Sequence, residues 1–180
     1  LFAIKSKIAE KLNIPQDISD GLPIVTVTGK NEIYVSVGHD SRLSAERIKN
    51  AVIKALVSNG VNVADCGLSS TPAMFMTTVE MGCDGAVQIT ASHHPKDRNG
   101  LKFFTREGGL EGKDIEAILT HAQNDEHPTA CDGGKITDVD YMSQYAQGLC
   151  DKIKKEVNAE DYDHPLTGFK IVVDAGNGAG

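Results

Sequence analysis

The sequence predicts an α/β domain in which helices flank a mixed, largely parallel β-sheet. First, segments with the apolar pattern of strands alternate with segments whose apolar residues recur at helical spacing, and this order is typical of an α/β layer. Second, 40% of the 180 residues are hydrophobic and 24% are charged, as in an ordinary globular protein. Third, turn-forming pairs such as Asn99-Gly100 reverse the chain between elements. The length allows one full domain and the beginning of another.

The first part of the chain carries the weakest local signals. Apolar residues at helical spacing predict a core-facing helix over residues 1–12. Two apolar runs, at 24–28 and 33–37, are joined by a turn at 29–31. This arrangement predicts a β-hairpin.

The next elements alternate between helix and strand. Ser44 is an N-cap residue for a helix that ends near residues 59–60, and a strand follows at 61–65. Thr71 is a cap candidate, and the proline after it suits the first turn of a helix, so a helix is predicted from 71 to about 81.

A strand at 86–90 leads directly into the most informative loop of the sequence. Apolar and polar residues alternate along this strand, which ends just before Ser92. Turn-forming residues then reverse the chain into a second short strand at 101–105. This reversal brings Lys102 back toward Ser92, at the end of a strand where α/β proteins often display their chemistry.

The last part of the chain contains two more helices and a domain boundary. Apolar residues at helical spacing predict helices over 115–122 and 139–157. A linker-like stretch precedes a predicted strand at 169–174. We therefore assign residues 1–165 to the first domain and residues 166–180 to a linker and the first strand of a second domain.

Composition excludes several classes of protein. No apolar run approaches the ~20 residues that span a bilayer, so no membrane insertion is expected. The net charge of −7, without a basic cluster, argues against binding to nucleic acid. The sequence has four widely spaced cysteines, Cys66, Cys83, Cys131 and Cys150. This spacing predicts reduced thiols and a cytoplasmic protein. The chain begins as though partway through a helix, so a targeting segment ahead of it stays possible.

Several short sequence motifs occur in the order found in the α-D-phosphohexomutase superfamily. They are VGHDSRLS at 37–44, GLSSTPAMF at 67–75, TASHHP at 90–95, NGLK at 99–102 and VVDAGNG at 172–178. Together they resemble the N-terminal domain of phosphoglucomutases and phosphomannomutases, from about residue 33 to the end. The residues between 107 and 166 match less closely.

The resemblance implies a phosphoryl-transfer reaction at Ser92. In the superfamily this serine carries a phosphoryl group, and the enzyme interconverts hexose 1-phosphate and hexose 6-phosphate through a hexose 1,6-bisphosphate, which also acts as activator. Lys102 matches a lysine that contacts the phosphate or assists proton transfer. His93 matches a histidine that either hydrogen-bonds the phosphoserine or substrate or shapes the turn. Mg²⁺ is implied, with Ser92 as a metal ligand through its phosphate.

Two histidines depart from the superfamily pattern. His94 stands where Asn is common, and His39 replaces the first arginine of a segment that usually reads Gly-Arg-Asp-x-Arg. Asp40 and Arg42 of that segment lie at the end of a strand. An ion pair that braces the Ser92 loop is the favoured interpretation for them, and direct contact with substrate is the alternative. Adjacent histidines rarely chelate one ion, so a zinc site is not expected.

Two other functions remain as rivals. A non-catalytic phosphosugar-binding or regulatory module could keep the fold and use the same loop only to hold a phosphorylated ligand. A phosphatase or other serine hydrolase is a weaker rival, because the sequence has no G-x-S-x-G motif. The superfamily's Asp-Gly-Asp-x-Asp-Arg metal loop and its sugar-selecting loops are also missing. The partners we expect are therefore hexose phosphates and the remaining domains of the same polypeptide, with the choice among glucose, mannose and N-acetylglucosamine left open.

Overall fold

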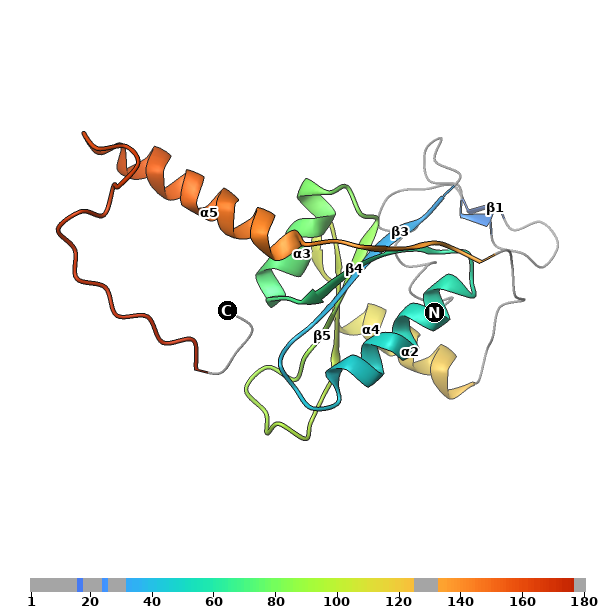
Figure 1. The fold of residues 1–180 in the computed structure, drawn as a ribbon. Coiled ribbons are helices and arrows are strands. Elements are labelled where there is room, and N and C mark those ends of the chain that lie inside the picture. The colour runs from blue at the N-terminus through green and yellow to red at the C-terminus, as the bar shows by residue number, and fades with distance from the viewer. Residues whose placement is uncertain (1–15, 18–23, 26–31, 125–132, 177–180) are drawn as a thin grey trace.

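The computed structural model describes residues 16–17, 24–25, 32–124 and 133–176 (Figure 1). It contains a six-stranded mixed sheet with helices packed on its faces. The helix predicted over residues 1–12 and Cys131 lie outside the described residues.

The main sheet confirms the predicted fold class. Its strands run in the order β7-β6-β5-β3-β4-β8. Neighbouring strands are parallel from β5 through β3 and β4 to β8, whereas β6 is antiparallel to β5 and β7 is antiparallel to β6. The bounds are β3 (Tyr34–His39), β4 (Asn62–Leu68), β5 (Gly85–Ile89), β6 (Leu101–Thr105), β7 (Gly108–Gly109) and β8 (Ile136–Asp138).

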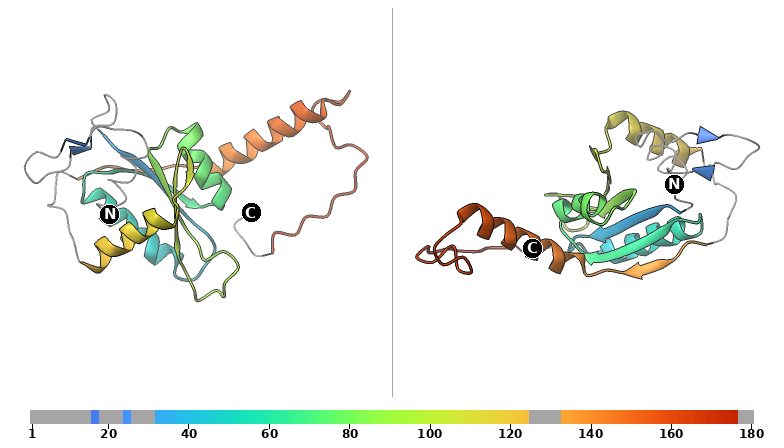
Figure 2. Two further views of the ribbon diagram at one scale, coloured as in Figure 1. Left: turned by 180° about the vertical axis from the view of Figure 1, so that it is seen from behind. Right: turned by 90° about the horizontal axis from the view of Figure 1, so that it is seen from above.

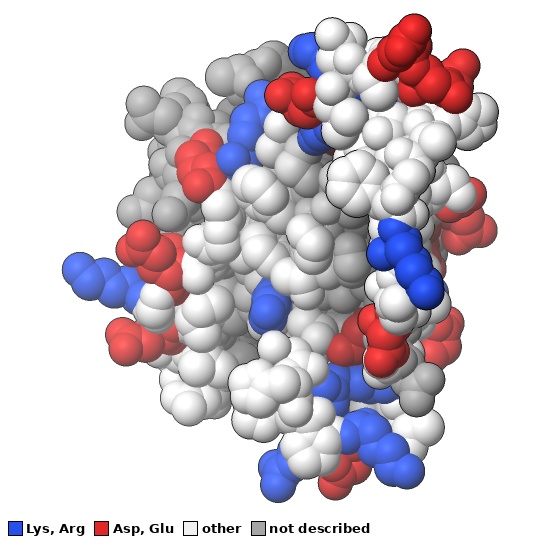
Figure 3. Space-filling view, turned by 90° about the vertical axis from the view of Figure 1, so that its left-hand side faces the viewer, with Lys and Arg blue, Asp and Glu red and all other residues white. Residues whose placement is uncertain are grey.

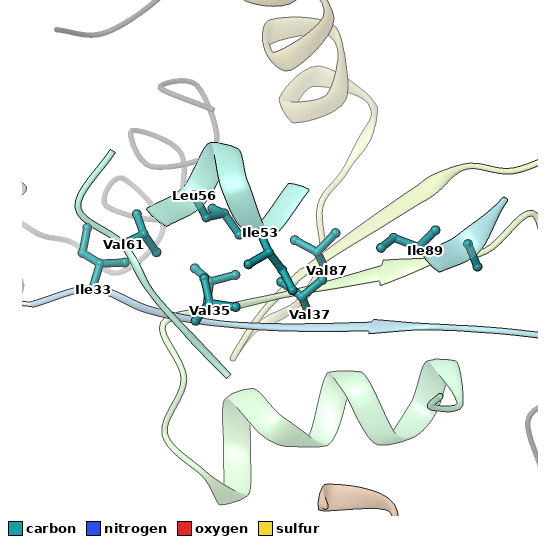
Figure 4. Packing of buried hydrophobic residues seen from close by; sticks show 10 residues of the cluster. Ile33, Val35, Val37, Ile53, Leu56, Val61, Val87 and Ile89 are labelled. Atoms are coloured by element: carbon teal, nitrogen blue, oxygen red, sulfur yellow. The ribbon is translucent and has the colours of Figure 1, made fainter. Parts of the chain in front are cut away.

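Helices α2 (Ala45–Val57) and α3 (Thr71–Glu80) cover opposite faces of the sheet. Figure 4 shows the first layer, where Ile53 and Leu56 of α2 pack against Val35, Val37 and Val87 of the central strands. On the other face, side chains of α3 pack against β5 and against the start of a later helix. Successive residues of a strand point to opposite faces, and both faces of β5 are covered, so the strand is buried along its whole length, including the polar Gln88.

The two later helices form where the apolar spacing predicts them. They are α4 (Gly112–Gln123) and α5 (Tyr141–Val157). The first turn of α5 is anchored, because Tyr141 is buried and its hydroxyl donates a hydrogen bond to Glu80 Oε2 over 2.5 Å. The rest of α5 projects away from the sheet (Figures 1 and 2), and the side chains of Leu149, Ile153 and Val157 on its apolar stripe are exposed. No helix in the described part of the chain is both long enough and apolar enough to cross a membrane.

The predicted hairpin is wrong. Residues Ile24–Val25 form β2, which pairs antiparallel with β1 (Gln16–Asp17) in a separate small sheet. The strand at 34–39 is instead the centre of the main sheet, between two parallel neighbours. Both of its edges are occupied by these neighbours, so it has no hydrogen-bonding edge left for residues 24–28.

Of the two predicted helix caps, Ser44 has the predicted position and Thr71 does not. Ser44 is the N-cap residue of α2, but its side chain makes no capping bond, and its Oγ accepts a hydrogen bond from Asn99 Nδ2 over 3.1 Å. The cap of α3 is Ser70, whose Oγ accepts from the backbone N–H of Ala73 over 3.3 Å. Thr71 is therefore the first residue of the helix and not its cap.

The strand predicted at 169–174 is not present. This stretch has no regular secondary structure, and its apolar side chains are exposed, with Val172 at 88% and Val173 at 85%. A strand requires a neighbour for its backbone N–H and C=O groups, and no neighbouring strand lies beside this stretch among the described residues. The apolar pattern is present, but the backbone partners that would make it a strand are not.

Candidate active site

The candidate site lies at the carboxyl ends of the parallel strands. The turn after β3 and the loop after β5 meet there, because the N–H of Asp40 donates to the carbonyl of Ile89 over 3.0 Å. The N–H of Thr90 donates to the carbonyl of Gly100 over 2.9 Å, which closes the base of the loop. In α/β sheets this edge is where loops from neighbouring strands build binding sites.

Ser92 has an unusual backbone conformation. Its φ is +54°, in the left-handed region that residues other than glycine rarely adopt. Its N–H donates to Thr90 Oγ1 over 3.0 Å, which supports the turn. The side chain is exposed, and its hydroxyl has no hydrogen-bond partner among the described residues. The loop therefore presents the Ser92 hydroxyl to solvent on a constrained backbone.

The guanidinium of Arg42 holds this loop together. Its Nη2 donates to the carbonyl of Ser92 over 2.6 Å, and its Nη1 donates to the carbonyls of Pro95 and Arg98 over 2.5 and 3.1 Å. Its Nε donates to Asp40 Oδ2 over 3.0 Å, and the Arg42 side chain is only 9% exposed. Through these contacts Arg42 braces the Ser92 loop, because its guanidinium donates to loop carbonyls and to the Asp40 carboxylate.

Asp40 links this brace to the strand that leads into the loop. Its Oδ2 accepts from Thr90 Oγ1 over 2.7 Å as well as from Arg42 Nε, and its Oδ1 accepts from the backbone N–H of Arg42 over 3.2 Å. Both carboxylate oxygens are thus engaged by the protein. Thr90, through which Asp40 reaches Ser92, was not among the predicted site residues, although it ends the strand and is the first residue of the TASHHP motif.

The other predicted residues lie on or beside the loop. The rings of His93 and His94 are exposed and stacked, with centroids 4.9 Å apart and an angle of 20° between the ring planes. Lys102 lies opposite Gln88 in the antiparallel pair of β5 and β6, so the predicted reversal of the chain is confirmed. The Lys102 side chain is exposed, and no hydrogen bond joins it to Ser92 within the described parts of the chain.

The described residues do not make a complete metal site. No group of three or more His, Cys, Asp or Glu side chains is placed to hold an ion in residues 32–124 and 133–176. The nearest carboxylate in the network, Asp40, is already engaged by Arg42 and Thr90. A Mg²⁺ ion at Ser92 therefore needs ligands beyond those that this part of the chain supplies.

Cys66 is a poor candidate for a nucleophile. Burial raises the pKa of the Cys66 thiol to about 12, and the nearby Cys83 and Asp65 add to this increase. A thiol must be deprotonated to react. Ser92 is accordingly the better candidate for a reactive group.

The surface around the core is mixed in charge. On the face shown in Figure 3, Lys and Arg side chains are interspersed with Asp and Glu side chains around a mainly uncharged area. The net charge of the chain is −7. Anion binding at the Ser92 loop must therefore depend on local donors.

The fold and the site together define an α/β domain protein with a serine-centred loop site at the carboxyl edge of its sheet. Residues 10–129 match the family model described as phosphoglucomutase/phosphomannomutase, alpha/beta/alpha domain I. The chain therefore belongs to the phosphoglucomutase/phosphomannomutase family.

Curated relatives agree with this assignment. The chain is 34% identical over 151 residues to a phosphoglucosamine mutase of Lactobacillus delbrueckii subsp. bulgaricus, a match that covers 81% of the chain and 32% of the relative. It is 33% identical over 150 residues to a phosphomannomutase/phosphoglucomutase of Pseudomonas putida, covering 83% of the chain and 30% of the relative. The chain thus spans about a third of the length of the curated relatives that it matches.

A solved structure supports the fold. The crystal structure of a phosphoglucomutase/phosphomannomutase family protein from Burkholderia thailandensis matches with a TM-score of 0.60 and 22% identity. The match covers 86% of this chain and 31% of that one. At this identity the likeness establishes the shared α/β architecture.

Proposed function

We propose that this chain is the phosphoserine-bearing domain of a phosphohexomutase. The observation that carries the proposal is the Ser92 loop, which holds an exposed serine hydroxyl on a left-handed backbone braced by Arg42. Family membership and the mutase names of the relatives support the same reaction class.

In the proposed reaction, Ser92 carries a phosphoryl group and passes it to a hydroxyl of a hexose monophosphate. The hexose oxygen forms a bond to phosphorus while the bond from phosphorus to Ser92 Oγ breaks. The hydroxyl proton leaves the hexose, and a proton is delivered to Ser92 Oγ. The resulting hexose 1,6-bisphosphate reorients, and its other phosphoryl group returns to Ser92 by the reverse exchange. No net phosphate is consumed in a complete cycle.

We assign charge stabilisation to Lys102. A phosphoserine carries roughly −1.5 to −2 charge near neutral pH, so a cation must offset it before an anionic sugar phosphate can approach. Lys102 lies on β6, the strand that follows the Ser92 loop, and it is not engaged in an ion pair among the described residues. Arg42 is committed to the loop backbone and leaves this role to another cation. His93 contacts the phosphate or shapes the turn, and the proposal does not depend on which.

The rest of the proposed enzyme lies outside this domain. Residues 1–165 form the first domain and residues 166–180 begin the next. The Mg²⁺ ion that such reactions use would take a phosphate oxygen on Ser92 as one ligand, with carboxylates from elsewhere in the polypeptide. The cytoplasmic setting that we propose rests on the absence of predicted disulfides.

The test is transfer of a phosphoryl group to Ser92. The full-length protein is incubated with glucose 1,6-bisphosphate and analysed by intact mass, beside Ser92→Ala and a matched control, Ser58→Ala, at an exposed serine that follows α2. One phosphoryl group on the wild type and on Ser58→Ala, but not on Ser92→Ala, supports the proposal. A wild type that takes up no phosphoryl group supports the non-catalytic binding module instead.

A further inference from the structure

A line of charged side chains runs from helix α2 to the turn beside the Ser92 loop. At its inner end is Lys49, a buried lysine whose Nζ lies 2.8 Å from Asp65 Oδ2 on β4 and 3.4 Å from Glu46 Oε1 on α2. Burial by itself lowers the pKa of Lys49, but the hydrogen bond and charge of Asp65, together with Glu46, raise it overall. Lys49 is therefore a charged group held between two carboxylates.

The second oxygen of Glu46 extends this line toward the site. Glu46 Oε2 lies 3.3 Å from His39 Nε2 at the end of β3. His39 Nδ1 lies 2.7 Å from the backbone carbonyl of Asp40, and a carbonyl can only accept, so Nδ1 donates. The His39 ring thus fixes the backbone of the residue whose carboxylate holds Arg42 and Thr90. Each link from Lys49 to Asp40 is a contact between named atoms.

A contribution to stability alone does not account for the contacts of Glu46. The Glu46 side chain is 63% exposed, and an exposed ion pair adds little to the free energy of unfolding. What Glu46 does provide is orientation, since one carboxylate touches both Lys49 and His39. When both ring nitrogens carry a proton, His39 Nε2 donates to a carboxylate that a buried ammonium holds on its other side, and this pair keeps the ring in one place.

We propose that Lys49 and Glu46 are positioning residues for Ser92. They act through His39 and Asp40, which set the turn that faces the Ser92 loop. The expected change in reaction rate rests on the proposed function. If Ser92 transfers a phosphoryl group, a misplacement of its hydroxyl by up to about 1 Å should slow the transfer about tenfold to a hundredfold. Its structural consequence, a change at Ser92 itself, stands without that function.

The first experiment substitutes Glu46→Gln in the full-length protein labelled with ¹⁵N-serine. Because Glu46 is exposed, the thermal midpoint of unfolding should stay that of the wild type. The amide signal of Ser92 should shift, and transfer of phosphate from glucose 1,6-bisphosphate to Ser92 should slow by about tenfold. The control is Lys54→Gln on the same helix, an exposed lysine in its last turn, which should change neither the signal nor the rate.

The second experiment substitutes Lys49 and tests for rescue. Lys49→Met leaves Asp65 without its cation and should slow phosphate transfer, whereas Lys49→Arg restores the charge and should recover most of the rate. A Ser92 amide signal that is unchanged in both Glu46→Gln and Lys49→Met refutes the inference. If the wild type takes up no phosphate but the Ser92 signal shifts in Glu46→Gln, the proposed function fails and the positioning role stands.

Discussion

Replacement of Arg42 by lysine tests whether the Ser92 loop is held by the guanidinium. Arg42 donates to the carbonyls of Ser92, Pro95 and Arg98 and to the carboxylate of Asp40. A lysine ammonium is a compact point charge and cannot span these four acceptors, so it keeps the pairing with Asp40 and at most one carbonyl. Arg42→Lys therefore loses two hydrogen bonds to the loop.

The size of the effect follows from these two bonds. At about 1 kcal/mol of net stabilisation each, their loss lowers the free energy of loop opening by about 2 kcal/mol. Since about 1.4 kcal/mol corresponds to a factor of ten, the open loop becomes roughly 30-fold more populated. Global stability should change much less, because the sheet and its two apolar layers do not include these contacts.

Amide hydrogen exchange measures this local opening. The N–H groups of His94 and Arg98 donate within the loop, to the carbonyls of Ala91 and Pro95, each over 3.0 Å. In Arg42→Lys these two amides should exchange roughly 30-fold faster, while the amides of the central strands keep their wild-type rates. The control is Arg106→Lys, because within residues 32–124 and 133–176 the Arg106 guanidinium makes one hydrogen bond, of 3.4 Å, to the carbonyl of Thr78 in α3.

Two results would refute this reasoning. Wild-type exchange at His94 and Arg98 in a folded Arg42→Lys protein would show that the loop is held by something else. Equal acceleration of loop and core amides would show that Arg42 supports the whole fold and not the loop. Only a change confined to the loop agrees with the contacts in the structure.

Two further predictions concern buried groups away from the loop. Tyr141→Phe removes the hydrogen bond to Glu80 and should lower the free energy of unfolding by about 1 kcal/mol in urea titrations near pH 8, whereas Tyr145→Phe should not. Burial and Glu80 raise the pKa of Tyr141. The stabilisation that the neutral Tyr141 hydroxyl gives the folded protein is therefore complete below pH ~10 and is lost as the pH rises further. In Tyr141→Phe, the free energy of unfolding should not show this loss. A thiol reagent at pH 8 should label the exposed Cys150 of the native protein and spare the buried Cys66, whose pKa is raised to about 12; peptide mapping that finds both labelled equally would contradict this.

Local patterns in the sequence were sufficient to predict most of the helices and strands. The strands around the loop follow from alternation at 86–90 and from the Asn99-Gly100 turn, and the helices follow from apolar spacing. The failure at 24–37 has a clear physical cause, because two apolar runs joined by a turn carry the same local signal whether they pair with each other or with distant strands. Pairing is decided by strands that come later in the sequence, at 62–68 and 85–89.

The contacts within the site were less predictable than the elements that carry it. Ser44 was assigned the right position by its cap signal, but its hydroxyl bonds Asn99, 55 residues away, instead of the helix. Arg42 donates to backbone carbonyls 50 to 56 residues away. Every residue has a backbone carbonyl, so the residue types do not show which carbonyls will accept these bonds. Sequence patterns can thus place Arg42 at the end of a strand but cannot show what it holds.

The brace explains how a serine can keep a left-handed backbone in a solvent-exposed loop. Such a conformation costs about 1–3 kcal/mol for a residue other than glycine. Three carbonyl contacts from Arg42, at about 1 kcal/mol each, offset that cost. Since one of the three carbonyls belongs to Ser92 itself, the strained residue is held directly and not through its neighbours. The loop is therefore formed before any substrate binds, so binding need not supply the free energy to order the serine that we propose carries the phosphoryl group.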